Sequence, residues 1–146
     1  MNKNYMGIII IIICSFFLLP HNTYSSSKED YELQEKCGKR CDEMFRKDYG
    51  NGTDNKGMIS NYQNHYNKKL NKCFFLIMNT SVSRNKKTNK VESLIMRNLF
   101  DVNENKEYGS FVRWSYSFTP NDCRVLEKYC KSESEWDSLV KPYMEE

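Results

Sequence analysis

The chain has 146 residues and a formal net charge of +3 at neutral pH. This length suits one domain and is short for two, and the near-neutral charge excludes a strongly basic nucleic-acid-binding protein and an acidic disordered tail. The hydrophobic fraction of 39% overstates the apolar content of the folded part, because six consecutive isoleucines occupy residues 8–13.

The first 25 residues have the composition of a secretory signal peptide. Lys3 gives a positively charged start, residues 7–19 are apolar, and the small residue Ser25 follows at a suitable cleavage position. Because a membrane-spanning helix needs roughly 20 apolar residues, we expect cleavage and no permanent span; an uncleaved signal-anchor that tethers the protein is the open alternative. The sequence therefore predicts a single exported domain, periplasmic or secreted, over residues 26–146.

Five cysteines follow this segment. In an exported chain, that number indicates disulfide bonds and one leftover thiol. Cys37 and Cys41 are four apart in a predicted helix, where Cβ atoms lie about 5–6 Å from each other, too far for a mutual disulfide. We expect one bond between Cys123 and Cys130, and a second bond from Cys73 to either Cys37 or Cys41.

Residues 28–49 form the clearest predicted helix. Acidic residues occupy its first turn and basic residues its last, which suits the helix dipole, and Gly50 follows as a stop signal. Apolar residues recur at steps of three and four and define one packing face. That face consists of Leu33, Cys37, Cys41, Met44, Phe45 and Tyr49.

The middle of the chain predicts an antiparallel sheet of three strands, with a fourth strand left open. Residues 72–82 are a compact apolar run, and residues 91–102 and 108–118 follow across polar turns. The last of these segments alternates apolar with polar residues, which predicts one buried and one wet face. The apolar members of this alternation are Val112, Trp114, Tyr116 and Phe118.

Residues 59–71 are ambiguous. Tyr62, Tyr66 and Leu70 keep helical spacing, but several asparagines disfavour a helix, so a short helix and an irregular segment that leads into a strand both stay open.

The C-terminal part of the chain predicts a second, short helix. Pro120 is expected to end the sheet, and Ser132 or Ser134 can cap the helix. Pro142 is expected to limit this helix to about two turns. The order helix, strands, helix predicts an α+β fold that disulfides stabilise.

Four neighbouring residues are the candidate binding contacts: His65, Tyr66, Lys68 and Lys69. A Cys–His nucleophilic pair would require a free thiol beside His65, and because one sequence cannot show such groups converging, we identify no catalytic residue. The part of the chain after the signal segment has this one histidine, so we expect no metal site and no cofactor.

Lysines gather in residues 68–72 and 86–90, close to aromatic side chains. This combination suits an anionic polymer of the cell surface, while export makes a nucleic acid an unexpected partner. Alternatively, the lysines keep an apolar strand edge from aggregating.

Three stretches of the chain carry a resemblance to known proteins. They are the Cys37-x-x-x-Cys41 helix, the segment HYNKKLNKCF from His65 to Phe74, and the closing stretch from CKS at Cys130 to LVKPYMEE. Together they resemble small exported bacterial proteins of no assigned activity. The resemblance implies a bacterial protein that is periplasmic or secreted, and it assigns no catalytic residue.

These features predict an exported binding or interaction module whose partner is an envelope protein or an anionic surface polymer. Two alternatives stay open: a thiol-dependent enzyme that uses a free cysteine with His65, and a periplasmic inhibitor or immunity-type protein.

Overall fold

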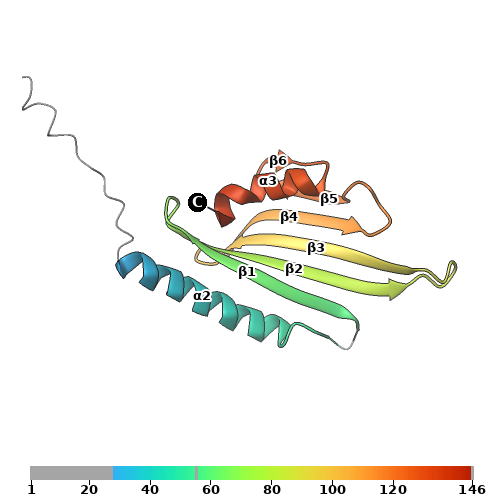
Figure 1. Ribbon diagram of the computed structural model, residues 1–146, viewed down its shortest axis with the longest axis horizontal. Helices are drawn as coiled ribbons and strands as arrows, with labels where there is room; N and C mark the ends of the chain where they lie inside the picture. The colour runs from blue at the N-terminus through green and yellow to red at the C-terminus, as the bar shows by residue number, and fades with distance from the viewer. Residues whose placement is uncertain (1–27, 55, 146) are drawn as a thin grey trace, which may run out of the picture.

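The computed structural model describes residues 28–54 and 56–145. In chain order, the elements are α2 (Lys28–Tyr49), β1 (Met58–Asn67), β2 (Lys72–Arg84), β3 (Val91–Asp101), β4 (Lys106–Trp114), β5 (Asp122–Val125), β6 (Lys128–Tyr129) and α3 (Glu133–Met144). Each strand pairs antiparallel with the next along the chain, which gives one sheet in the order β1-β2-β3-β4-β5-β6 (Figure 1). The predicted α+β class is confirmed, but the sheet has six strands rather than three or four.

The predicted signal peptide lies outside the described residues. Within those residues, neither helix has the length and apolarity that crossing a membrane requires.

Helix α2 begins and ends at the residues that the sequence predicts. Its apolar face packs on the sheet and buries Cys37, Cys41 and Phe45. The helix ends because Gly50 adopts a φ of +61°, a left-handed conformation that glycine enters without steric cost. The Gly50 N–H donates to the Arg46 carbonyl and closes the last turn.

Strand β2 is buried on both of its faces. Residues 73–77 are all buried, because side chains alternate along a strand and a different helix covers each face. Phe75 and Ile77 belong to the apolar cluster that includes the buried residues of α2. Phe74 and Leu76 belong to the cluster that includes α3. This double burial explains why the sequence shows a continuous apolar run here instead of an alternating one.

Most of the ambiguous segment 59–71 belongs to strand β1, and residues 68–71 form the turn to β2. The whole of β1 pairs with β2 without a break in register, from Met58 opposite Ser81 to Asn67 opposite Lys72. Tyr62 and Tyr66 both pack against α2. A spacing of four residues places two side chains on one face of a strand as well as on one face of a helix, so this spacing could not decide between the two.

The strand predicted over residues 108–118 ends earlier than expected. Its last pair with β3 joins Trp114 to Leu94, and the chain then turns so that the Asn121 N–H donates to the Val112 carbonyl at 2.7 Å. Tyr116 and Phe118, predicted to be buried, are 64% and 101% exposed. The alternating pattern continues past the last residue that has a partner strand, and it cannot show where pairing stops.

Pro120 does not end the sheet, which was the expectation from the sequence. It lies in the loop between β4 and β5, and β5 returns to pair with β4 through Gly109 opposite Val125 and Val112 opposite Asp122. Both β5 and β6 are short, and neither carries enough apolar residues to show a period in the sequence.

Helix α3 starts at the predicted cap. The Ser132 side chain accepts a hydrogen bond from the Glu135 N–H at 3.2 Å. The helix runs to Met144, beyond the two turns expected. Pro142 cannot donate to the carbonyl four residues before it, but it does not end the helix, and the Glu145 N–H still donates to the Lys141 carbonyl at 2.8 Å. Trp136 and Val140 bury its apolar face.

Two glycine substitutions are predicted to change stability in opposite directions. A Cβ at Gly109 would lie 2.9 Å from the Trp136 ring and 3.0 Å from the Arg124 carbonyl oxygen, so Gly109→Ala should lower the free energy of unfolding by about 1–3 kcal/mol. Gly38 lies inside α2, where a Cβ meets only Asn64 at 3.8 Å. Gly38→Ala should therefore raise the free energy of unfolding by about 0.5–1 kcal/mol.

Urea denaturation of the two variants measures both changes. An increase in stability in Gly109→Ala would contradict the close packing of Trp136 on β4. A decrease in stability in Gly38→Ala would contradict the finding that a Cβ at this position of α2 has room.

Candidate functional site

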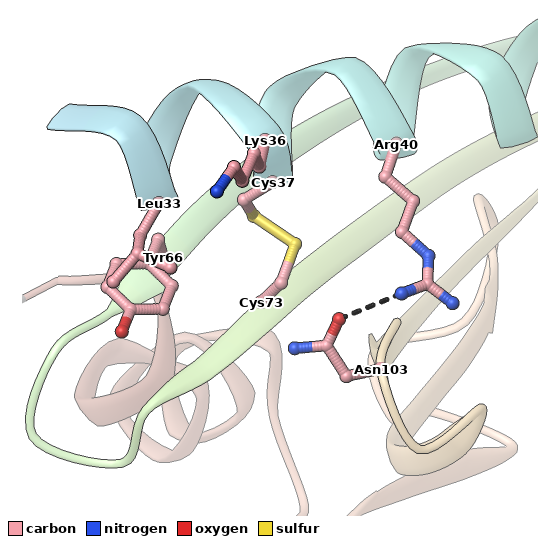
Figure 2. A pocket seen from close by; sticks show the side chains of 7 residues that line it. All are labelled: Leu33, Lys36, Cys37, Arg40, Tyr66, Cys73 and Asn103. Carbon is pink, nitrogen blue, oxygen red and sulfur yellow. Dashed lines mark hydrogen bonds between the residues drawn. A yellow bond between two sulfur atoms is a disulfide. The ribbon is translucent and has the colours of Figure 1, made fainter. Parts of the chain in front are cut away.

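Three buried sulfur atoms lie together between α2 and β2. Cys37 and Cys73 form a disulfide (Figure 2), and the Cys41 sulfur is 3.7 Å from the Cys73 sulfur. All three sulfurs lie within 4.8 Å of one another. Of the two bonds predicted for Cys73, the structure contains the one to Cys37, and Cys41 is the leftover thiol. The predicted bond between Cys123 and Cys130 is also present.

The Cys41 thiol is a poor nucleophile where it lies. Burial raises the pKa of this thiol to about 12, against a smaller opposing effect of Arg40. The reactive thiolate is therefore a small fraction of Cys41 at neutral pH. Three thiolates would suit a soft metal ion, but the disulfide leaves Cys41 as the one cysteine of this cluster with a free sulfur.

His65 and Cys41 lie on opposite faces of the sheet. Tyr66 packs in the same apolar cluster as Cys41, and neighbouring residues on a strand point to opposite faces. His65 is therefore directed to the α3 side, as is Asn67, whose amide donates to the Pro142 carbonyl at 2.9 Å. The Cys–His pair considered from the sequence is not assembled.

Two of the other predicted binding residues, Tyr66 and Lys68, contact α2, and the third, Lys69, does not. Tyr66 is only 7% exposed. Its hydroxyl donates to the Asn71 side-chain oxygen at 2.6 Å, and its backbone N–H donates to the side-chain oxygen of Gln34 on α2 at 3.0 Å. Lys68 pairs with the Asp30 carboxylate at 3.0 Å. Lys69 is exposed.

A small cavity of about 230 Å³ lies beside the disulfide. Figure 2 shows that Lys36 and Arg40 extend from α2 on either side of Cys37. Arg40 donates to the Asn103 side-chain oxygen at 3.0 Å. The residues that line the cavity are Leu33, Lys36, Cys37, Arg40, Tyr66, Cys73 and Asn103.

Aromatic side chains gather at the opposite end of the sheet, in what we call the aromatic loop: Trp114, Tyr116 and Phe118. The Trp114 and Tyr116 rings stack with centroids 5.8 Å apart, and Phe118 is fully exposed. Burying a side chain of this kind stabilises a protein by about 1.5–3 kcal/mol. Phe118 does not contribute this free energy to folding, because it stays exposed. A cavity of about 410 Å³ beneath the loop extends to Arg113 and Glu133.

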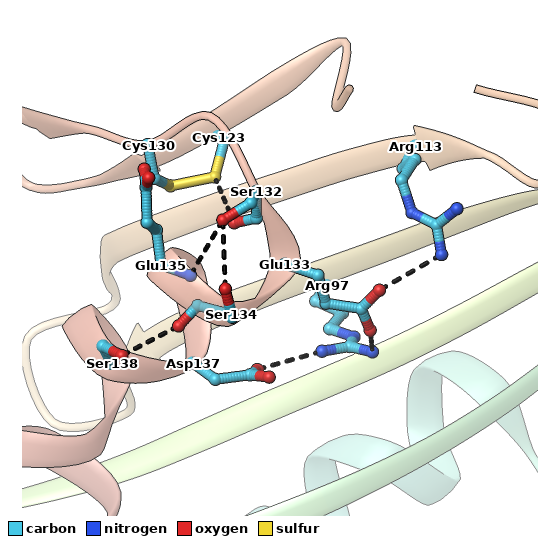
Figure 3. Close-up of polar contacts among 10 residues, drawn as sticks. All are labelled: Arg97, Arg113, Cys123, Cys130, Ser132, Glu133, Ser134, Glu135, Asp137 and Ser138. Atoms are coloured by element: carbon cyan, nitrogen blue, oxygen red, sulfur yellow. Dashed lines mark hydrogen bonds and ion pairs between the residues drawn. A yellow bond between two sulfur atoms is a disulfide. The ribbon is translucent and has the colours of Figure 1, made fainter. Parts of the chain in front are cut away.

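The conformation of this loop is fixed by ion pairs to α3 (Figure 3). Arg113 donates to the Ser117 carbonyl at 3.3 Å and to Glu133 at 3.1 Å. Arg97 also pairs with Glu133, and with Asp137 at 3.1 Å. The Cys123–Cys130 disulfide lies just before α3 and holds the start of the helix against β5.

The turn between β2 and β3 carries a cluster of exposed cations, which we call the basic hairpin: Arg84, Lys86, Lys87 and Lys90. Glu92, the one acidic residue within residues 84–93, accepts a hydrogen bond from Asn85 at 2.8 Å. The excess positive charge of the hairpin is therefore open to solvent.

The basic hairpin and the aromatic loop are neighbours. The Ser115 N–H donates to the Ser93 carbonyl at 2.8 Å, and the Ser93 N–H donates to the Ser115 hydroxyl at 3.0 Å. Lys90 precedes Ser93 by three residues, about 10 Å along a strand. Figure 1 shows the turn after β2 and the loop after β4 at the same end of the sheet.

Comparison with protein-family models, with curated protein sequences and with solved structures found no match to this chain. The resemblance to small exported bacterial proteins stays a prediction, and the function must be argued from the geometry.

The lysines of the basic hairpin are evident in the sequence. The aromatic loop is not, because the alternating pattern predicts that its side chains belong to the core. Ser115, Ser117 and the turn-forming pair Pro120-Asn121 were the signal that the strand ends early, since all are typical turn residues.

Tyr66 is predicted to contribute to stability. Tyr66→Ala should lower the free energy of unfolding by about 3 kcal/mol, because it empties a buried site between α2 and β1. Tyr66→Phe should cost about 1 kcal/mol through loss of the hydroxyl bond to Asn71. Lys69→Ala is the control and should stay within about 0.5 kcal/mol. Equal losses for Tyr66→Ala and Lys69→Ala in urea denaturation would contradict this assignment.

Proposed function

We propose that this chain is an exported, disulfide-stabilised binding module that docks on an anionic lipid surface through the aromatic loop and the basic hairpin. The observation that carries the proposal is the fully exposed Phe118 beside four exposed cations. The two disulfides are compatible with an oxidising compartment, as an exported protein requires.

An anionic membrane offers both kinds of contact that this end of the molecule presents. Its headgroups attract each nearby Lys or Arg by about 1 kcal/mol, and its apolar layer accepts an inserted Phe side chain for about 2 kcal/mol. Aromatic rings with a polar edge, such as those of Trp114 and Tyr116, favour the level of the headgroups. Together these contributions suit a reversible association that weakens in salt.

A soluble anionic polymer is the competing partner. It would use the cations of the basic hairpin, but it has no apolar layer into which Phe118 could insert. The dependence of binding on Phe118 therefore separates the two partners.

Vesicle co-sedimentation of the protein that begins at Ser26 tests the proposal. We expect binding to phosphatidylglycerol vesicles and little binding to phosphatidylcholine vesicles. Phe118→Ser should weaken binding about thirtyfold, the equivalent of about 2 kcal/mol. The pair Lys86→Gln and Lys87→Gln should weaken it by about as much.

Tyr31→Ser is the matched control. Tyr31 is 71% exposed on the first turns of α2, at the end of the molecule away from the aromatic loop (Figure 1), so this variant should bind as the parent does. Loss of binding in the lysine variant but not in Phe118→Ser would contradict membrane docking and indicate a purely charged partner. Absence of binding to phosphatidylglycerol vesicles would also contradict the proposal.

A further inference from the structure

We propose that Cys41 exchanges with the Cys37–Cys73 disulfide, and that this exchange converts Cys37 into a thiol in the cavity wall that takes up a low-molecular-weight disulfide. The inference rests on the sulfur cluster and the cavity beside it, and it is independent of the proposed membrane docking.

The geometry of α2 allows either of its cysteines to bond to Cys73. Cys37 and Cys41 are one helical turn apart on the same face, and Cys73 lies across from both on β2, with its sulfur bonded to one and 3.7 Å from the other. The two bonds would close loops of similar length, since the sequence separations are 36 and 32 residues. Chain entropy therefore favours neither bond.

The exchange is balanced without an external oxidant. The Cys41 thiol loses its proton, and the thiolate attacks the Cys73 sulfur. A bond forms between Cys41 and Cys73 as the bond between Cys37 and Cys73 breaks. Cys37 leaves with the electron pair as a thiolate, so one disulfide and one thiol exist before and after the step.

The position of the thiol changes its access to solvent. Cys37 lines the cavity beside the disulfide, whereas Cys41 is absent from the cavity wall and fully buried. Lys36 and Arg40 also line this cavity, and nearby cations favour a thiolate over a thiol. The exchange therefore moves the free sulfur from a position away from the cavity to one in its wall.

A disulfide that enters the cavity completes the modification. The Cys37 thiolate attacks one sulfur of the incoming molecule, forms a mixed disulfide with that half and releases the other half as a thiolate. Lys36 and Arg40 favour an incoming molecule that carries carboxylates. Cys41 lies away from the cavity wall, so its direct reaction with the incoming molecule is slow in comparison.

Incubation of the native, unreduced protein with oxidised glutathione tests the inference. After the remaining thiols are blocked, peptide mass spectrometry locates the adduct and the disulfide. We expect glutathione on Cys37 together with a bond between Cys41 and Cys73. Glutathione on Cys41 with the Cys37–Cys73 bond intact would overturn the inference, as would an adduct that forms only after unfolding.

Two cysteine variants provide the matched pair. Cys37→Ser should form the Cys41–Cys73 disulfide and show no free thiol when it is unfolded without reductant; two free thiols in the folded variant would overturn the inference. Cys41→Ser should keep the Cys37–Cys73 bond and lose the adduct at least about tenfold. An undiminished adduct on Cys37 in Cys41→Ser would show that glutathione attacks the disulfide directly, and it would overturn the role of Cys41.

Discussion

The burial of β2 on both faces is the constraint on which the rest of the molecule depends. Residues 73–77 present apolar side chains alternately to α2 and to α3, so two helices must cover the same stretch of one strand. Burial decreases beyond that stretch: residues 78–81 are half-buried, and residues 82–84 are exposed. Stability is thereby concentrated at one end of the sheet, and the other end carries the exposed aromatic and basic side chains.

The two disulfides also correspond to the two helices that cover the sheet. The bond between Cys37 and Cys73 joins α2 to the buried end of β2, and the bond between Cys123 and Cys130 fixes the chain just before α3. Each disulfide therefore holds one helix on one face of the sheet. Among residues 28–54 and 56–145, a third sulfur is in contact only at the first bond. This additional thiol allows the covalent link to α2 to change partners without being lost.

The sequence predicts those parts of the fold that one periodic pattern determines. Helix α2 was predicted to the residue because its apolar face, charged ends and terminal glycine agree. Tyr62 and Tyr66 could not assign β1, since their spacing fits both a strand and a helix. Tyr116 and Phe118 were placed in the core because alternation does not reveal where a neighbouring strand ends. Of the residues predicted as binding contacts, Tyr66 and Lys68 contact α2, whereas Lys69 is exposed. The contacts with α2 could not be predicted, since the distance between β1 and α2 is not encoded in either segment alone.

The central claim is that one end of the sheet holds the fold together while the other binds. Hydrogen–deuterium exchange, measured with and without phosphatidylglycerol vesicles, tests it most directly. The account predicts that vesicles slow exchange in residues 82–93 and 114–121 and leave residues 65–73 unchanged. Slower exchange in residues 65–73, with no change in the aromatic loop or the basic hairpin, would contradict it.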